Sequence, residues 1–439
     1  MSARVEREAL VLPRSWGRER RLYWHDVERL DGRRLYCRDE ALTLDAASCA
    51  PVGEVLADRA RDGDAAADPG ALRDRLLAVD AAPGYWPARW LGVLLRHAVA
   101  LECSDVHLGV RQEHVEVELR RHGTIMPLLA LPSSRHAPLV GAAKSMAGLR
   151  SYVHDIVQEG RLRLAEVDVD VRVSVLPTVA GERLAFRLPD PRVRSLALTD
   201  LGFDPEERSA LEAVLRRRSG LFLVTGPSGV GKTTTLYAAL RHVMLEDGGR
   251  SRVATVEDPP EALLPGVTQV RLNPGDGLDM DVALAHLLRQ DVDVIAVGEI
   301  RDRATARAAV GAALTGHLVL ATLHCGSATE AVHRLRELDV PADRLAHALL
   351  GVMAQRLTRL RCAACGVNGL GVATCPRCLG TGFDGRSAIA ELLLLGEADR
   401  SAVAEGRPPA EPTRRLAERA NERVQRGLTS AAEATACAR

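Results

Sequence analysis

The segment LFLVTGPSGVGKTT, residues 221–234, is the feature that most constrains the fold of this 439-residue chain. Gly226, Gly231, Lys232 and Thr233 satisfy the spacing G-x-x-x-x-G-K-[ST], between an apolar run and a helical pattern. Glycines in such a loop let backbone amides turn toward phosphate oxygens, and the N-terminus of the following helix adds its positive dipole. The segment therefore predicts a strand, a phosphate-binding loop and a helix in succession.

Lys232 is one of only two lysines in the chain, although Lys and Arg together number 58. An ammonium is a compact point charge that fits inside a phosphate loop, whereas a guanidinium is larger and directs its donors differently. We therefore expect Lys232 to reach the β- and γ-phosphates of ATP, and Thr233 to bind Mg²⁺. The residues expected to bind the nucleotide are Gly226, Pro227, Ser228, Gly229, Val230, Gly231, Lys232, Thr233, Thr234 and Asp258.

Short apolar segments alternate with helical patterns after residue 190, at 221–225, 253–256, 294–297 and 318–323. Strands and helices that alternate in this way predict a parallel sheet covered by helices on both faces. The predicted fold class of this part of the chain is therefore α/β.

Acidic and histidine side chains flank three of these predicted strands. Glu257 and Asp258 follow the second strand, Glu299 follows the third, and His317 and His324 lie at the two ends of the fourth. Ligands of open α/β folds bind at the carboxyl edge of the sheet, and we expect these residues to converge there. A carboxylate at that edge can hold magnesium through water or polarise the attacking water, and Glu257 and Glu299 are both candidates for the general base.

The pattern before residue 190 predicts a separate domain. Residues 1–85 contain no motif that indicates a function, and within them a linker is expected near 56–71. Breaks without periodicity over 188–207 indicate a boundary, so we expect one domain over 86–190 and another over 191–439.

Two stretches of the middle domain alternate apolar with polar residues, at 114–123 and 165–176, which predicts half-buried strands. A connection that contains Pro and Gly then leads to a further strand. The resulting hairpin places Arg172 and Arg187 among the polar-face residues of neighbouring strands, because each lies between apolar neighbours in a period of two.

Four of the nine cysteines form two close pairs, with the spacing C-x2-C-x9-C-x2-C. Four thiolates in two pairs favour tetrahedral zinc, and a closed shell of four thiolates makes the role structural. Zinc ribbons also occur in nucleic-acid binders, but the neighbouring residues offer no basic stripe or aromatic platform. The predicted zinc ligands are Cys362, Cys365, Cys375 and Cys378.

The charge of the chain gives no electrostatic argument for binding nucleic acid or an acidic membrane, because 58 acidic residues balance 58 basic ones. The N-terminus lacks the apolar core of a signal peptide, and no apolar run approaches the ~20 residues needed to span a bilayer. The expected location is therefore cytoplasmic, with no transmembrane segment.

Five blocks occur in a fixed order along the chain: TGPSGVGKTTTLY, TVEDPPE, LLRQDVDVIAVGEIRD, TGHLVLATLH and CPRCLGTGFDGRSAIAELL. They resemble the Walker A, Asp box, Walker B, His box and zinc element of the secretion ATPases that drive type II secretion and type IV pilus assembly, the GspE/PilB-like traffic ATPases. The resemblance extends from about residue 103 to the C-terminus.

This resemblance implies a RecA-like ATPase domain preceded by a PAS-like domain, in a homohexameric ring with ATP bound between the two domains. It implies that Arg172 and Arg187 move onto the γ-phosphate when the domains close, where guanidinium groups suit the developing phosphoryl charge. It also adds Arg289 to the expected catalytic residues, beside His317 and His324. The chain departs from the family at Ala285, where a second arginine is usual.

The function implied by the resemblance is a cytoplasmic ATPase, peripheral at the inner membrane, that couples ATP hydrolysis to extension of a type IV pilus or a type II secretion pseudopilus. Its expected partner is an inner-membrane platform protein, and no direct contact with nucleic acid is expected. Extension is favoured over retraction because the retraction ATPases lack the four-cysteine element. Two alternatives stay open: a ring component that binds nucleotide with weak or no hydrolysis, and a nucleic-acid-linked motor of the same fold.

Overall fold

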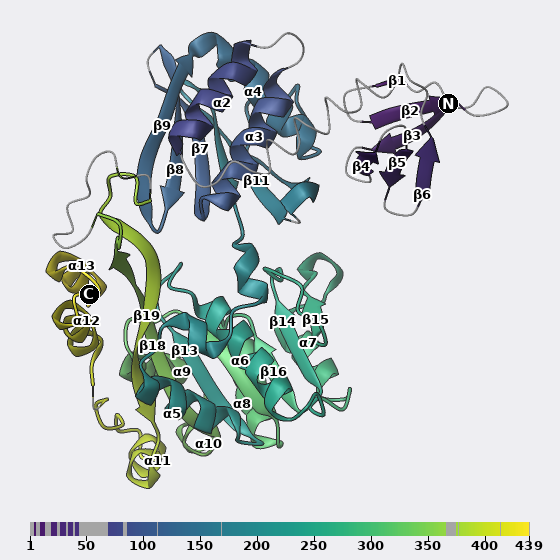
Figure 1. Ribbon diagram of the computed structural model, residues 1–439. Helices are drawn as coiled ribbons and strands as arrows, with labels where there is room; N and C mark the ends of the chain where they lie inside the picture. The colour runs from purple at the N-terminus through teal and green to yellow at the C-terminus, as the bar shows by residue number, and fades with distance from the viewer. Residues whose placement is uncertain are drawn as a thin grey trace. The chain divides into compact units, whose positions relative to one another are not determined.

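Besides six short strands near the N-terminus, the computed structural model describes residues 69–81, 86–111, 113–167, 169–365, 375, 377–412 and 414–438. The chain divides into two compact units, Met1–Asp190 and Pro191–Arg439 (Figure 1). Residues 56–68 of the predicted linker lie outside the described residues. The six short strands form two three-stranded sheets and are β1 (Arg4–Val5), β2 (Ala9–Pro13), β3 (Glu19–Tyr23), β4 (Val27–Asp31), β5 (Arg34–Cys37) and β6 (Glu40–Thr43).

The main sheet of the first unit has six antiparallel strands in the order β10-β11-β12-β7-β8-β9. Alternate residues of β8 are buried, as are alternate residues over most of β11, and this confirms the predicted half-buried strands and the hairpin. The strand in 165–176 begins later than predicted, because 165–167 form a short 3-10 turn. The strands are β7 (Cys103–Arg111), β8 (His114–Arg121), β9 (Thr124–Pro132), β10 (Gln158–Leu164), β11 (Val169–Thr178) and β12 (Gly181–Arg187).

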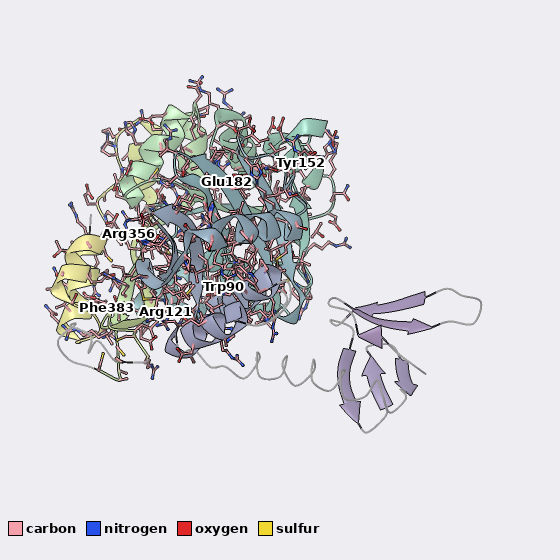
Figure 2. All side chains as sticks on the ribbon, turned by 90° about the horizontal axis from the view of Figure 1, so that it is seen from above. Trp90, Arg121, Tyr152, Glu182, Arg356 and Phe383 are labelled. Carbon is pink, nitrogen blue, oxygen red and sulfur yellow. The ribbon has the colours of Figure 1, made fainter. Side chains whose placement is uncertain are left out.

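Three helices cover one face of this sheet: α2 (Pro69–Ala81), α3 (Trp86–Ala100) and α4 (His136–Met146) (Figure 1). Nine of the fifteen residues of α3 are buried, including all six from Trp90 to Leu95, and the indole of Trp90 (labelled in Figure 2) has no exposed surface. Leu72 of α2 belongs to the same core, so this core begins earlier in the chain than the predicted boundary at residue 86.

The sheet of the second unit has seven strands in the order β15-β14-β16-β17-β13-β18-β19. Six are parallel, and β19 is antiparallel to β18. The four strands predicted to be parallel, β13, β14, β16 and β17, are parallel, and the antiparallel β19 lies at the edge where the chain turns back after β18 instead of crossing over the sheet. The strands are β13 (Gly220–Thr225), β14 (Val253–Glu257), β15 (Thr268–Arg271), β16 (Val294–Val297), β17 (Leu318–Leu323), β18 (Leu349–Arg361) and β19 (Phe383–Leu394).

Helices cover both faces of the second sheet, as predicted, and β13 shows why its strands read as continuous apolar runs. Leu221 and Leu223 pack into the core on one face, whereas Phe222 and Val224 pack into the core on the other. The first core includes α7 (Met280–Leu287), α8 (Arg303–Leu314), α9 (Ala328–Glu337), α10 (Ala342–Ala348), α11 (Glu397–Ala404), α12 (Leu416–Gln425) and α13 (Ala431–Cys437). The second includes α5 (Pro205–Leu215) and α6 (Lys232–Glu246).

Among the helices of the described residues, none has the length and apolar character required to cross a bilayer.

Candidate nucleotide-binding site

The phosphate loop, residues 226–231, joins the buried end of β13 to the first turn of α6, which confirms the predicted order of strand, loop and helix. Gly226, Gly229 and Gly231 have φ angles of 147°, 80° and 86°, a region that residues with a Cβ rarely adopt. A Cβ at Gly226 would also lie 2.6 Å from the carbonyl oxygen of Gln355. Glycine is therefore required at Gly226 both by its backbone conformation and by the close approach of β18.

Lys232 is the first residue of α6, and its ammonium turns back over the loop. Its Nζ donates hydrogen bonds to the carbonyl oxygens of Gly226, at 2.7 Å, and Pro227, at 3.0 Å. Burial lowers the pKa of Lys232, and the Glu299 carboxylate opposes that shift. The ammonium therefore lies inside the loop, and Thr233 is the next residue in the same helical turn.

The side chain of Gln355, on β18, forms hydrogen bonds with both the phosphate loop and helix α6. Its side-chain Nε2 donates to the carbonyl oxygen of Val230 at 2.7 Å, and its Oε1 accepts from the hydroxyl of Thr235 at 2.7 Å. All of these groups are buried, so each hydrogen bond replaces one that water would otherwise make. The sequence did not indicate Gln355, because β18 is buried on both faces and shows no alternation.

Thr225 and Arg356 hold the segment that carries His324. The Thr225 hydroxyl donates to the carbonyl of Leu323 at 3.1 Å and accepts from the backbone amide of Cys325 at 3.0 Å. The guanidinium of Arg356 donates to the carbonyl of Gly326 at 2.8 Å. The end of β17 and the residues that follow it are thereby fixed against the phosphate loop, and His324 itself is exposed.

Glu257, the last residue of β14, is buried with its carboxylate fully engaged. It accepts hydrogen bonds from the hydroxyls of Tyr237, at 2.5 Å, and Thr255, at 2.7 Å, and from the amide of Gln269 at 3.2 Å. Burial, reinforced by the Glu257 charge, raises the pKa of Tyr237, so that hydroxyl stays protonated and donates. The neighbouring Asp258 is exposed.

Glu299 lies two residues after the end of β16, and its carboxylate is less buried than that of Glu257. The amide of Gly298 donates to the carbonyl of Val256 at 2.8 Å, and its carbonyl accepts from the Thr322 hydroxyl at 2.5 Å. The Glu299 side chain keeps 29% of its surface exposed and accepts from Arg301 Nε at 2.7 Å. Because Glu299 is accessible and its charge acts on Lys232, it is better placed than Glu257 to meet a water molecule.

The predicted convergence on the carboxyl edge is confirmed for the phosphate loop, Glu257, Glu299 and His324, because β13, β14, β16 and β17 are parallel and end side by side. It is wrong for His317. That residue precedes β17, and its carbonyl accepts from the amide of Gly220 at the start of β13. His317 and His324 flank the six residues of β17 and are therefore about 23 Å apart along the strand, at ~3.3 Å per residue.

Arg289 also lies away from the phosphate loop within the second unit. It is exposed and follows α7, before β16 begins at Val294. This position is at the amino edge of the sheet, the edge where His317 lies.

Arg172 and Arg187 face each other on the first unit. They are directly paired in register between β11 and β12, and Arg161 of β10 is paired with Arg172 on its other side. All three arginines are exposed, and within the described residues none of them has a hydrogen bond or an ion pair. Asp105 of β7 is paired in register with Arg187 on its other side, but its ion pair is with Arg120. Like charges placed directly opposite destabilise a sheet, so this row of cations is suited to an anion.

The four predicted zinc ligands lie together between β18 and β19. Their sulfur atoms are all within 4.8 Å of one another, with Cys362 and Cys375 at 3.9 Å and Cys365 and Cys378 at 3.3 Å. Four thiolates around one zinc ion at ~2.3 Å place the sulfurs about 3.8 Å apart, so the cluster fits this ion. The amide of Gly382 donates to Cys378 Sγ at 3.3 Å, as expected for a site that stabilises thiolate.

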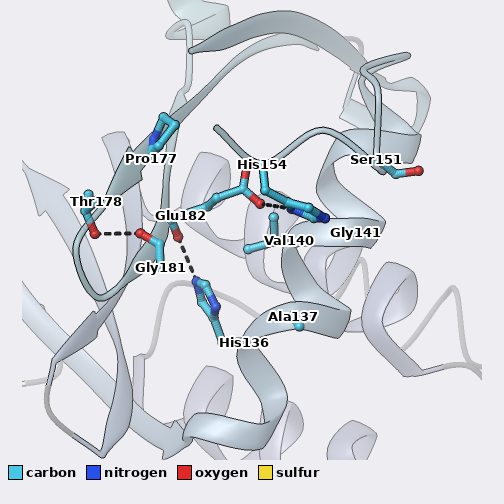
Figure 3. A pocket seen from close by; sticks show the side chains of 10 residues that line it. All are labelled: His136, Ala137, Val140, Gly141, Ser151, His154, Pro177, Thr178, Gly181 and Glu182. Carbon is cyan, nitrogen blue, oxygen red and sulfur yellow. Dashed lines mark hydrogen bonds and ion pairs between the residues drawn. The ribbon is translucent and has the colours of Figure 1, made fainter. Parts of the chain in front are cut away.

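A cavity of about 350 Å³ lies in the first unit between α4 and the β11–β12 hairpin (Figure 3). The carboxylate of Glu182 at its wall accepts from His154 Nδ1 at 2.7 Å and pairs with Lys144, whose side chain is completely buried, at 2.5 Å. Burial opposes ionisation of Glu182, but the hydrogen bonds from His154 and Lys144 outweigh it and lower the pKa of the carboxyl. The second lysine of the chain is therefore part of a buried ion pair.

A phosphate loop at the carboxyl edge of a parallel sheet, with a lysine inside it and an accessible carboxylate beside it, defines a P-loop ATPase. The particular family follows from comparison with known proteins: residues 88–437 match the family model described as "Type II/IV secretion system protein". The chain belongs to this family of secretion ATPases, and the predicted resemblance is confirmed.

Two relatives show the extent of the similarity. The chain is 42% identical over 341 residues to the type II secretion system protein HxcR of Pseudomonas aeruginosa. This alignment covers 76% of this chain and 71% of that protein. It is 39% identical over 342 residues to the type IV pilus assembly ATPase PilB of Thermus thermophilus. This alignment covers 72% of this chain but 38% of that protein.

Two solved structures share the fold. The pilus retraction motor PilT with bound ADP aligns with a TM-score of 0.56 at 23% identity, over 79% of this chain and 96% of that one. The ATPase DotB of Yersinia pseudotuberculosis aligns with a TM-score of 0.61 at 18% identity, over 80% and 93%.

Proposed function

We propose that this protein is a cytoplasmic ATPase that works as a hexameric ring and couples ATP hydrolysis to assembly of a type IV pilus or a type II secretion pseudopilus. The observation that carries the proposal is the site itself, where the phosphate loop, Glu299 and His324 occupy one edge of one sheet. The chain that carries this site is 42% identical to a type II secretion protein and 39% identical to a pilus assembly ATPase.

The residues of the loop suggest how ATP is held. The loop amides and Lys232 would bind the phosphates, and the Thr233 hydroxyl would hold Mg²⁺, an ion that prefers oxygen ligands. Glu299 would orient the attacking water and accept its proton, because it is accessible where Glu257 is buried under three donors. Glu257 would then act as a fixed anchor beneath the site.

The first unit would contribute Arg172 and Arg187. Their unpaired guanidinium groups, side by side on one exposed face, would meet the γ-phosphate when the first unit closes on a nucleotide held by the second. We assign this unit the PAS-like role and place its boundary near residue 190. His317 and Arg289 lie at the opposite edge of the second sheet, so this proposal gives them no contact with the phosphates held by the loop of the same chain.

The remaining assignments concern the zinc element and the partners. The four cysteines would hold one structural zinc ion between β18 and β19. The ring would act beside the inner membrane on a platform protein that assembles pilin-like subunits, without direct contact to nucleic acid.

Steady-state ATP hydrolysis of wild type and Glu299→Gln tests the proposal. Loss of the proton acceptor should lower kcat by about 100-fold, while binding of the non-hydrolysable analogue AMPPNP is retained. Glu246→Gln, which changes an exposed glutamate at the end of α6, is the matched control and should keep wild-type turnover. Equal rates for wild type and Glu299→Gln would show that the measured hydrolysis does not come from this site.

A further inference from the structure

Arg356 of β18 is a buried cation without an anionic partner in the described part of the chain. Its exposed fraction is 7%, and its hydrogen bonds within the described residues go to two carbonyl oxygens, of Gln355 at 3.0 Å and Gly326 at 2.8 Å. Figure 2 labels this residue. Burial lowers the pKa of Arg356, which is the direction expected of a guanidinium that has lost water without gaining a carboxylate.

The other buried arginines described in the second unit behave differently. Arg419 pairs with Glu207 at 3.0 Å, and Arg423 lies 3.7 Å from Asp204. Buried charges in proteins are usually paired in this way, because an isolated buried charge loses its hydration without compensation. Arg356 is thus an exception within its own unit.

The two carboxylates whose charge acts on Arg356, Glu391 and Glu330, form hydrogen bonds with other groups. Glu391 Oε1 accepts from the amide of Ala328 at 3.0 Å, and Glu330 Oε2 accepts from the amide of Gly326 at 2.6 Å. Both act on Arg356 only through their charge and not through an ion pair. The anion that would balance this guanidinium is therefore not among the described residues.

The position of Arg356 indicates where such an anion would bind. Its Nη1 atom lies 3.5 Å from the point where a Cβ would stand on Gly226, the first residue of the phosphate loop. Its positive charge also helps to lower the pKa of Lys232, after burial and against the Glu299 carboxylate. The guanidinium therefore lies next to Gly226, at the start of the loop that is proposed to bind phosphates.

We propose that Arg356 is a positioning residue whose counter-charge is the polyphosphate of the bound nucleotide. The inference rests on the proposed nucleotide site and adds a third cationic element to it, beside Lys232 and the helix dipole. Arg356 does not touch the nucleotide. Its positive charge attracts the phosphates from the far side of the loop backbone. Its hydrogen bond to the carbonyl of Gly326 also fixes the segment that carries His324.

This role predicts a loss of affinity that grows with the charge of the ligand. Calorimetric titrations of the full chain with Mg-AMPPNP, Mg-ADP and AMP would measure it. For Arg356→Met, we expect about tenfold weaker binding of AMPPNP, a smaller loss for ADP and almost none for AMP. Arg356→Lys keeps the charge and should restore most of the discrimination among the three ligands.

Arg359→Met is the matched control, because Arg359 lies on the same strand but pairs with Glu433 at 2.5 Å. It should lower thermal stability without changing the ratio of AMPPNP to AMP affinity. If Arg356→Met does not fold, Arg356→Gln, which is neutral but can still donate to a carbonyl, is measured in the same way. Equal losses for all three ligands, or an unchanged affinity for AMPPNP, would overturn the inference. Wild type that binds no nucleotide would instead overturn the proposed function.

Discussion

Gln355 and Val230 are 125 residues apart in the chain, and a 2.7 Å hydrogen bond joins the side chain of the first to the carbonyl of the second. The same amide accepts from Thr235 in the second turn of α6. One buried side chain therefore determines how the phosphate loop sits relative to the helix that follows it. The loop owes its shape to a distant strand as well as to its own glycines.

Replacing this amide should weaken the loop. Gln355→Met has nearly the same volume but leaves the Val230 carbonyl and the Thr235 hydroxyl without partners, at a cost of about 1–3 kcal/mol for each buried group. We expect a lower free energy of unfolding, measured by chemical denaturation, and weaker binding of Mg-ADP. Thr235→Val removes only one of the two bonds and should have the smaller effect. Wild-type values for Gln355→Met on both measurements would contradict the role.

The phosphate loop itself is tested at Lys232. Lys232→Ala should abolish ATP hydrolysis, because it removes the charge that meets the β- and γ-phosphates. Lys232→Arg should also be inactive, since a guanidinium does not fit where the ammonium contacts the carbonyls of Gly226 and Pro227. Hydrolysis rates are compared after thermal unfolding has shown both variants to be folded. Full activity of either variant would refute the assignment.

The parts of the site that the sequence predicted correctly are encoded locally. The phosphate loop and Glu299 come just after a short apolar strand, Glu257 is the last residue of another, and in a parallel sheet such strands end at one edge. His317 was misplaced because it precedes its strand while His324 follows it. The direction of β17 carries the two histidines to opposite edges.

The parts that the sequence did not predict depend on contacts between distant segments. Gln355 and Arg356 lie on a strand buried on both faces, so neither periodicity nor a motif separates them from the surrounding apolar residues. Their importance comes from Val230, Gly226 and Gly326, which only the fold brings to them. The one signal that could have indicated them is that they are the first polar pair after the uncharged, mostly apolar run 349–354.

The cysteine cluster predicts a metal-dependent stability. Purified wild type should contain one zinc ion per chain by elemental analysis, and the double variant Cys375→Ser and Cys378→Ser should contain none. Without the metal, the segment between β18 and β19 loses its crosslink, and the melting temperature should fall. Cys103→Ser, a buried cysteine in the first unit, is the control and should keep the zinc. Wild-type protein free of metal would refute the assignment.

The ion pair between Lys144 and Glu182 predicts a pH dependence of the first unit. The pKa of Glu182 is lower in the folded chain than its ordinary value of 4.5, because the hydrogen bonds from His154 and Lys144 outweigh its burial. Its contribution to stability is therefore complete above pH ~4.5 and is lost as the pH falls through the folded pKa. Glu182→Gln, which leaves the completely buried Lys144 uncompensated, should lower the free energy of unfolding at pH 7 by about 3 kcal/mol.

This difference between wild type and Glu182→Gln should shrink as the pH falls below ~4.5, where wild type also begins to bind a proton at Glu182. Urea denaturation followed by tryptophan fluorescence measures it, because all four tryptophans of the chain lie within residues 1–190 and Trp90 is in the core of the first unit. Glu159→Gln, an exposed glutamate on β10, is the control and should follow wild type at every pH. A difference that stays constant down to acidic pH would show that Glu182 acts through its packing and not through its charge.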